Sequence, residues 1–131
     1  MTIQKLILAL LLLTSTSVFV EDCSNSKTQT DYNDCENAEY SKLDKTLNHK
    51  YQQILAKTQG QQKKLLIQAQ REWIRFRDND CEFQTYATAM GSIHPMMMAI
   101  CLQAKTESRI DDLNKMLQCK EGDMSCGFAE D

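Results

Sequence analysis

Apolar residues recur at helical spacing along three long stretches of the chain, and no stretch alternates with the period of two that is typical of a surface strand. The stretches cover residues 31–57, 61–90 and 95–117. Gly60 and Gly91 separate them, and Pro95, the only proline, suits the first turn of a helix. The pattern therefore predicts an all-α fold, a small antiparallel three-helix bundle with short connections.

Each predicted helix carries an apolar stripe that we expect to face the core. In the first helix the stripe consists of Tyr40, Leu43, Leu47, Tyr51, Ile54 and Leu55. In the second it consists of Leu66, Ala69, Trp73, Phe76, Phe83 and Ala87. In the third it consists of Met98, Leu102, Thr106, Ile110, Leu113 and Leu117. Thr28 or Thr30 is expected to cap the first helix, since a threonine hydroxyl accepts a hydrogen bond from a first-turn N–H.

The first twenty residues follow another pattern. Lys5 precedes an unbroken apolar run at residues 6–13, and small polar residues follow it. This order is typical of a secretory signal peptide. The run is shorter than the roughly 20 apolar residues that a membrane-spanning helix needs. We therefore expect residues 1–20 to be removed and the mature chain to have no membrane span.

The rest of the chain divides into a helical domain, residues 21–118, and an irregular tail, residues 119–131, where Gly, Asp, Ser and Glu replace the apolar pattern. Glu21 and Asp22 stand directly before Cys23, where a lipoprotein signal carries small uncharged residues. We therefore expect no lipid anchor at Cys23.

Six cysteines follow the predicted signal peptide, and an even number in a short exported chain indicates a disulfide framework and a periplasmic or secreted location. Cys81 and Cys101 lie at similar distances on either side of the second connection, so they face each other in an antiparallel hairpin. A local Cys119–Cys126 bond then leaves Cys23–Cys35. The main alternative joins Cys35 to Cys81, across the first two helices.

The sequence gives little indication of metal binding, redox chemistry or nucleic-acid binding. There is no Cys-x-x-Cys and there are only two histidines, His49 and His94, so we expect no metal site, no redox pair and no cofactor. The formal net charge of −3 argues against nucleic acid as a partner and is compatible with a basic protein. The sequence does not indicate an oligomeric state.

A group of acids and bases lies in the second predicted helix. Asp78 and Asp80 are the pair that a glycosidase-like hydrolase would need. The favoured interpretation is structural, because residues three and four apart on a helix form ion pairs. We therefore expect Trp73, Arg77 and Asp78 to form a network between helices, and we assign no catalytic residue.

The connection Gly91-Ser92-Ile93-His94 is the candidate partner-binding segment. If Cys81 and Cys101 are joined beneath it, the loop is rigid, and a preorganised loop loses less entropy on binding. The other interpretation is that this segment only connects two helices.

Three blocks of the sequence resemble a known family. Residues 70–78, Gln-Arg-Glu-Trp-Ile-Arg-Phe-Arg-Asp, followed by Cys81, resemble the Q-R-x-W-x-x-[FY]-R-D-x-x-C signature of the LprI-like lysozyme-inhibitor family of bacterial exported proteins. A second block of the family is matched by Gly91-Ser92-Ile93, Cys101-Leu102, Thr106 and Arg109. The first block is matched by Cys35, Tyr40, Asp44, Leu47-Asn48 and Tyr51.

The resemblance implies a periplasmic or surface protein that inhibits a cell-wall lytic enzyme such as lysozyme. Members of the family also resemble immunity proteins, which neutralise toxin effectors delivered to the periplasm, for example by a type VI secretion system. Both alternatives imply a protein partner and no enzymatic activity. The tail with Cys119 and Cys126 extends beyond the family pattern.

Overall fold

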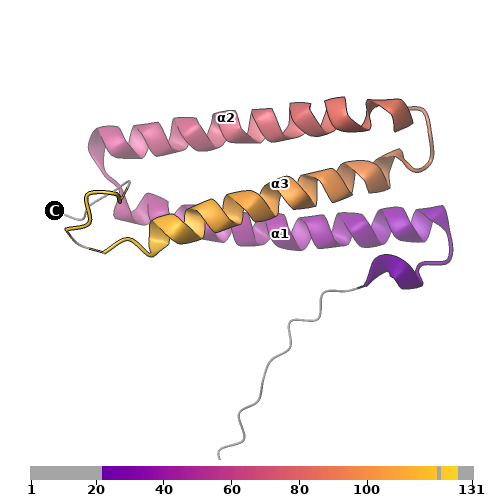
Figure 1. Ribbon diagram of the computed structural model, residues 1–131, viewed down its shortest axis with the longest axis horizontal. Coiled ribbons are helices and arrows are strands. Elements are labelled where there is room, and N and C mark those ends of the chain that lie inside the picture. Colours follow the sequence, from indigo (N-terminus) through magenta and orange to yellow (C-terminus); the bar gives the residue numbers. More distant parts are fainter. Residues whose placement is uncertain (1–21, 121, 127–131) are drawn as a thin grey trace, which may run out of the picture.

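The computed structural model describes residues 22–120 and 122–126. In this part of the chain three long helices lie side by side, as Figure 1 shows: α1 (Gln29–Lys57), α2 (Gly60–Thr85) and α3 (His94–Leu117). Two short 3-10 helices, η1 (Cys23–Asn25) and η2 (Tyr86–Thr88), precede α1 and follow α2. No strand occurs among the described residues, and the predicted all-α bundle is confirmed. The predicted signal peptide, residues 1–20, lies outside them.

Local hydrogen bonds set both ends of α1. The Thr28 hydroxyl accepts from the N–H of Asp31 at 3.1 Å, and the Asp31 carboxylate accepts from the N–H of Thr28 at 3.0 Å. This reciprocal capping box makes Thr28 the cap. At the other end, the buried Thr58 donates its hydroxyl to the Leu55 carbonyl at 3.0 Å. Gly60 was expected to end the first helix, but it is the first residue of α2, with a φ of +53° that favours glycine.

The hydrophobic core lies mainly between α1 and α3. Leu47 and Ile54 of α1 are 1% exposed, and Leu113 of α3 is fully buried beside Ile110. The predicted stripes of these two helices therefore face the core. From α2, only partly buried side chains pack against this cluster, among them Leu66 and Trp73.

The predicted inner face of α2 is wrong at several positions. Phe76 and Phe83 were expected in the core, but they are 57% and 80% exposed, and Ala69 and Ala87 are exposed as well. The residues of α2 that are buried instead are Gln70, Arg77, Cys81 and Thr85. Their spacing of seven, four and four keeps them on one side of a helix. The disulfide at Cys81 and the polar partners of α1 and α3 turn that side inward.

The end of α2 also differs from the prediction. We expected a helix to Met90, but α2 ends at Thr85 and the 3-10 helix η2 follows. The Thr85 hydroxyl donates to the Cys81 carbonyl at 2.8 Å, and the Thr88 hydroxyl donates to the Thr85 carbonyl at 2.7 Å. Such back-bonding competes with regular helical hydrogen bonds.

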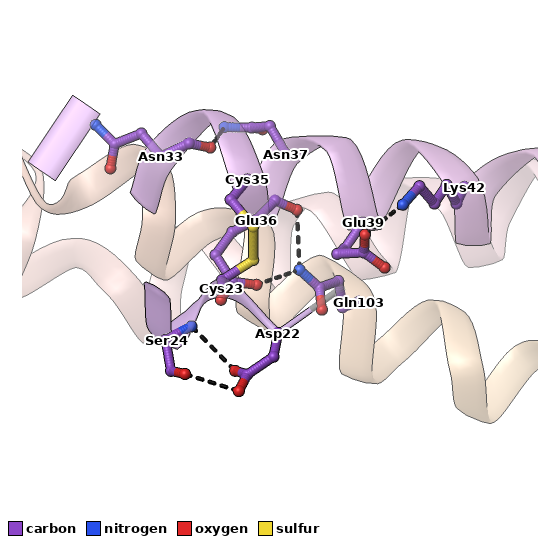
Figure 2. Close-up of a disulfide and its surroundings, with 10 residues drawn as sticks. All are labelled: Asp22, Cys23, Ser24, Asn33, Cys35, Glu36, Asn37, Glu39, Lys42 and Gln103. Atoms are coloured by element: carbon purple, nitrogen blue, oxygen red, sulfur yellow. Dashed lines mark hydrogen bonds and ion pairs between the residues drawn. A yellow bond between two sulfur atoms is a disulfide. The ribbon is translucent and has the colours of Figure 1, made fainter. Parts of the chain in front are cut away.

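Three disulfides join the pairs that the spacing favoured. Cys81 of α2 and Cys101 of α3 have Cα atoms 5.7 Å apart, so the Cys35–Cys81 alternative is wrong. In Figure 2, the Cys23–Cys35 bond holds η1 against the first turns of α1. Next to it, the Gln103 amide donates to the carbonyl and the carboxylate of Glu36, at 2.9 and 2.7 Å, and so ties α3 to α1.

The described part of the tail forms turns, and a Cys119–Cys126 disulfide closes it. None of the helices described here is long and apolar enough to cross a membrane.

Candidate functional site

The segment between α2 and α3 is a compact turn, and we call residues 86–94 the tip. The Gly91 N–H donates to the Thr88 carbonyl at 2.8 Å, and the His94 N–H donates to the Gly91 carbonyl at 3.1 Å. The Thr88 hydroxyl also lies 3.1 Å from Nδ1 of His94. A Cβ atom at Gly91 would lie 3.3 Å from the Thr88 carbonyl oxygen, so this tight turn favours glycine.

The tip is fastened to the rest of the bundle on two sides. Beneath it, the Cys81–Cys101 disulfide joins α2 to α3. Beside it, the Asn33 amide of α1 donates to the Ser92 carbonyl at 3.0 Å. Figure 1 shows the start of α1 and the tip at the same end of the molecule. The disulfide and this hydrogen bond thus connect the tip to all three long helices.

Large apolar side chains project from the tip. Tyr86 is 79% exposed, Met90 is fully exposed and Ile93 is 38% exposed. Aromatic residues and methionine are enriched in the contact surfaces of protein complexes. Three exposed apolar side chains on one fastened turn are therefore a good candidate for a protein-binding surface.

The four residues proposed for partner binding from the sequence differ in how exposed they are in the structure. Gly91, Ser92 and Ile93 are exposed, whereas His94 is partly buried next to Thr88. Tyr86 and Met90 were missed as site residues, because the predicted helix ran to Met90.

Acidic side chains also occur at this end of the molecule, around the start of α1. Asp22, Asp31 and Asp34 are exposed, and Lys27 is the only basic residue from 22 to 34. Hydrogen bonds from the side chain and backbone of Ser24 lower the pKa of Asp22. Hydrogen bonds from Thr28 likewise lower the pKa of Asp31. These carboxylates therefore stay ionised at neutral pH, and this end of the molecule is negatively charged.

Arg77 is the centre of a second group, which lies between α1 and α2. Its side chain is 7% exposed, and its Nε donates to Asp78 at 2.8 Å and its Nη1 to Asp44 of α1 at 3.3 Å. The guanidinium also lies over the rings of Trp73 and Tyr40, 5.2 and 5.6 Å from their centroids. The residues of the predicted network are thus brought together, and the network links α2 to α1.

The network continues to α3 through Trp73, whose ring also contacts Arg109. Arg109 lies 5.7 Å from the Trp73 centroid and donates from Nε to Oε1 of the buried Gln70 at 3.1 Å. Burial lowers the pKa of Arg109 from its usual value. Within the described residues, Nε2 of Gln70 and the hydroxyl of Thr106 are buried without a hydrogen-bond partner. The group is therefore a polar contact among three helices, with Arg77 and Gln70 buried and the carboxylates of Asp44 and Asp78 partly exposed.

Asp78 and Asp80 each have a basic partner. Asp78 accepts a hydrogen bond from Arg77, and Asp80 is paired with Lys105 and accepts from Gln84 at 2.6 Å. The hydrogen bond from Lys105 lowers the pKa of Asp80, whereas a general acid needs a raised one. Across the described residues, no three His, Cys, Asp or Glu side chains are grouped as a metal site.

These features define a class: a small helical domain that is held together by disulfides and a polar network and presents a fastened apolar tip. A profile of the family described as "Lysozyme inhibitor LprI" matches residues 21–113, which is most of the chain. The chain belongs to this family, and the resemblance seen in the sequence is confirmed.

The other comparisons add a relative and no solved structure. An uncharacterised protein of Rhizobium meliloti (strain 1021) is 31% identical over 113 residues, which are 76% of this chain and 81% of that protein. No solved structure gives a significant match.

The residues that carry the family resemblance have structural positions. Gln70, Arg77 and Cys81 are among the buried residues of α2, and the Trp73 ring contacts both Arg77 and Arg109. By contrast, Tyr86 and Met90 of the tip are outside the signature. These signature residues therefore hold α2 in place.

Proposed function

We propose that this protein is an exported inhibitor that binds a cell-wall lytic enzyme such as lysozyme and blocks it with the tip. The observation that carries the proposal is the fastened turn with Tyr86, Met90 and Ile93 exposed on it. Membership of the lysozyme-inhibitor family supports an inhibitory role. A rigid protruding turn can fill an enzyme's substrate cleft at a low entropic cost, because its conformation is already fixed.

The distribution of charge also supports a complex in which the tip end of the molecule faces the enzyme. Many lysozymes are basic, and the end of the molecule that carries the tip also carries Asp22, Asp31 and Asp34. Opposite charges on two partners accelerate their encounter and orient it. These three carboxylates therefore direct this end of the molecule toward a basic enzyme.

The site of action in this proposal is the periplasm or the exterior of the cell. Three disulfides suit an oxidising compartment, where cell-wall lytic enzymes also work. The signal peptide expected at residues 1–20 provides the export route.

The experiment is a lysozyme activity assay with purified, oxidised protein and lysozymes of several structural types. We expect inhibition of at least one type with a one-to-one end point. Tyr86→Ala should raise the inhibition constant about tenfold or more, as expected for an aromatic contact at the centre of an interface. The control is Leu65→Ala, which removes a 54% exposed apolar side chain near the start of α2, at the other end of that helix from the tip, and should leave the constant unchanged.

Two results would contradict the proposal. Absence of inhibition at a large molar excess across all lysozyme types would exclude the lytic enzyme as the target. A toxin effector delivered to the periplasm would then be the next partner to test. Full inhibition by a folded Tyr86→Ala protein would instead place the contact surface elsewhere, for example on the acidic face of α1 around Asp34, Glu36 and Glu39.

A further inference from the structure

An apolar groove opens at the end of the bundle where α1 is connected to α2. Side chains from all three long helices form its walls, including Ile54 of α1, Leu66 and Ala69 of α2, and Met116 of α3. The volume of the groove is about 270 Å³. Pockets that bind drug-sized ligands start at about 300 Å³, so the size of this groove suits a single large side chain.

The tail of the chain lies next to this groove. Met116 lines the groove and also a second pocket, whose walls include Cys119 and Cys126. Figure 1 shows the described part of the tail at the same end of the molecule as the α1–α2 connection. The Cys119–Cys126 disulfide ties residue 126 to a position two residues after the end of α3. The chain that follows Cys126 therefore starts from a fixed point close to the groove.

We propose that residues 127–131, which lie outside the described residues, dock in the groove and place the ring of Phe128 against Leu66 and Met116. The segment has the sequence Gly-Phe-Ala-Glu-Asp, and Phe128 is its only large apolar residue. Phe128 is two residues after Cys126, so their Cα atoms are at most about 7 Å apart. The disulfide thus keeps the ring within reach of the groove.

The charges around the groove also favour this segment as its occupant. Residues 56–69 contain three lysines, at positions 57, 63 and 64, and no acidic residue. All three lysines are exposed. Glu130 and Asp131 follow Phe128 by two and three residues, so a ring in the groove brings both carboxylates to this basic end of the molecule. Opposite charges at short distance attract each other, which adds to the apolar contact.

The docking goes beyond the proposed inhibition and does not depend on it. In Figure 1 the α1–α2 connection and the tip lie at opposite ends of the bundle. The family profile matches residues 21–113, so the tail follows the matched region. In this proposal the tail covers apolar walls that the three helices leave open to water.

NMR spectroscopy of the oxidised protein tests the docking directly. We expect nuclear Overhauser effects between the Phe128 ring and the methyl groups of Leu66 and Met116. Ala69→Glu should remove these effects, because a charged side chain in the wall of the groove cannot be covered by an aromatic ring without loss of its hydration. The matched control is Ala104→Glu, which changes an exposed alanine of α3 and should leave the effects in place.

Thermal unfolding measures what the contact contributes. Phe128→Ala should lower the thermal midpoint by about 4 °C or more, since a docked aromatic ring removes a large apolar area from water. The matched control is Phe83→Ala, which removes an 80% exposed ring and should change the midpoint little. In an Ala69→Glu protein, Phe128→Ala should have no further effect, because the ring is already displaced.

Two results would overturn the proposal at once: absence of the Overhauser effects, and equal thermal midpoints for Phe128→Ala and the wild type. Overhauser effects only between labelled and unlabelled copies would assign the groove to a second copy and overturn it as well. So would an apolar molecule that is bound in the groove of the purified protein. The lysozyme assay is a separate measurement, because Phe128→Ala keeps the tip and should inhibit like the wild type.

Discussion

The two contacts that hold the bundle together are built differently. Between α1 and α3, the contact is an apolar core of Leu47, Ile54, Ile110 and Leu113. α2, by contrast, joins this pair through a disulfide, hydrogen bonds and the cation–π contacts of Arg77. The first contact is apolar, and the second combines polar pairs with the partly buried Leu66 and Trp73. The comparison shows how a helix can be held largely by polar groups while large apolar side chains such as Phe83 stay exposed.

The largest effect should follow a cavity in the α1–α3 core. Leu113 is fully buried, so Leu113→Ala removes packed methyl groups and should lower the free energy of unfolding by about 3 kcal/mol. Denaturant titration measures the change. The control is Leu65→Ala on α2, where the side chain is 54% exposed and we expect less than about 1 kcal/mol. Equal losses at the two leucines would contradict the claim that the core lies mainly between α1 and α3.

A loss of similar size should follow removal of the disulfide that holds α2 to α3. Replacing Cys81 and Cys101 by serine frees a loop with a sequence separation of 20 residues, which costs about 3 kcal/mol in the chain-entropy account. Hydrogen exchange should also become faster in the tip. Unchanged exchange there would show that the disulfide does not rigidify the tip.

A smaller loss should follow replacement of Arg77. Arg77→Met keeps an apolar stem but removes the hydrogen bonds to Asp78 and Asp44, so we expect a loss of about 2 kcal/mol. The control is Arg75→Met, because Arg75 is exposed and its ion pair with Glu72 contributes almost nothing. Comparable stabilities of the two variants would mean that the polar contact does not hold α2.

The smallest effect concerns pH and the ion pair of Asp80 with Lys105. The pKa of Asp80 is lowered in the folded protein, so its contribution is present above the unfolded pKa, about 3.9, and is lost as the pH falls through the folded value. Asp80→Asn should therefore destabilise the protein slightly at neutral pH and not at all at strongly acidic pH. Thermal midpoints at both pH values measure this, and a pH-independent difference would exclude the ion pair as its cause.

Much of the fold is predictable from the sequence, because local signals agree with it. Thr28 followed by Asp31 is a capping signal, and Gly60 falls at a connection. The equal spacing of Cys81 and Cys101 around the second connection gives their pairing. Apolar spacing also places Leu47 and Leu113 correctly in the core.

The orientation of α2 is not predictable in the same way. Periodicity assigns Phe76 and Phe83 to the core because they are apolar. Two of the partners that turn the other side inward, Arg109 for Gln70 and Asp44 for Arg77, lie on other helices and cannot be read from α2 itself. The end of α2 before the tip is likewise not predictable from periodicity. Met90 continues the helical pattern, and only the back-bonds of Thr85 and Thr88 end the helix before it.

The dissociation constant of the complex with the inhibited lysozyme, compared between two methionine variants, tests the central claim most directly. Met90 in the tip and Met124 in the tail are both fully exposed. The account predicts that Met90→Glu weakens binding about tenfold or more at an unchanged thermal midpoint, while Met124→Glu binds like the wild type. Equal affinities of the two variants would contradict the assignment of the tip as the inhibitory surface.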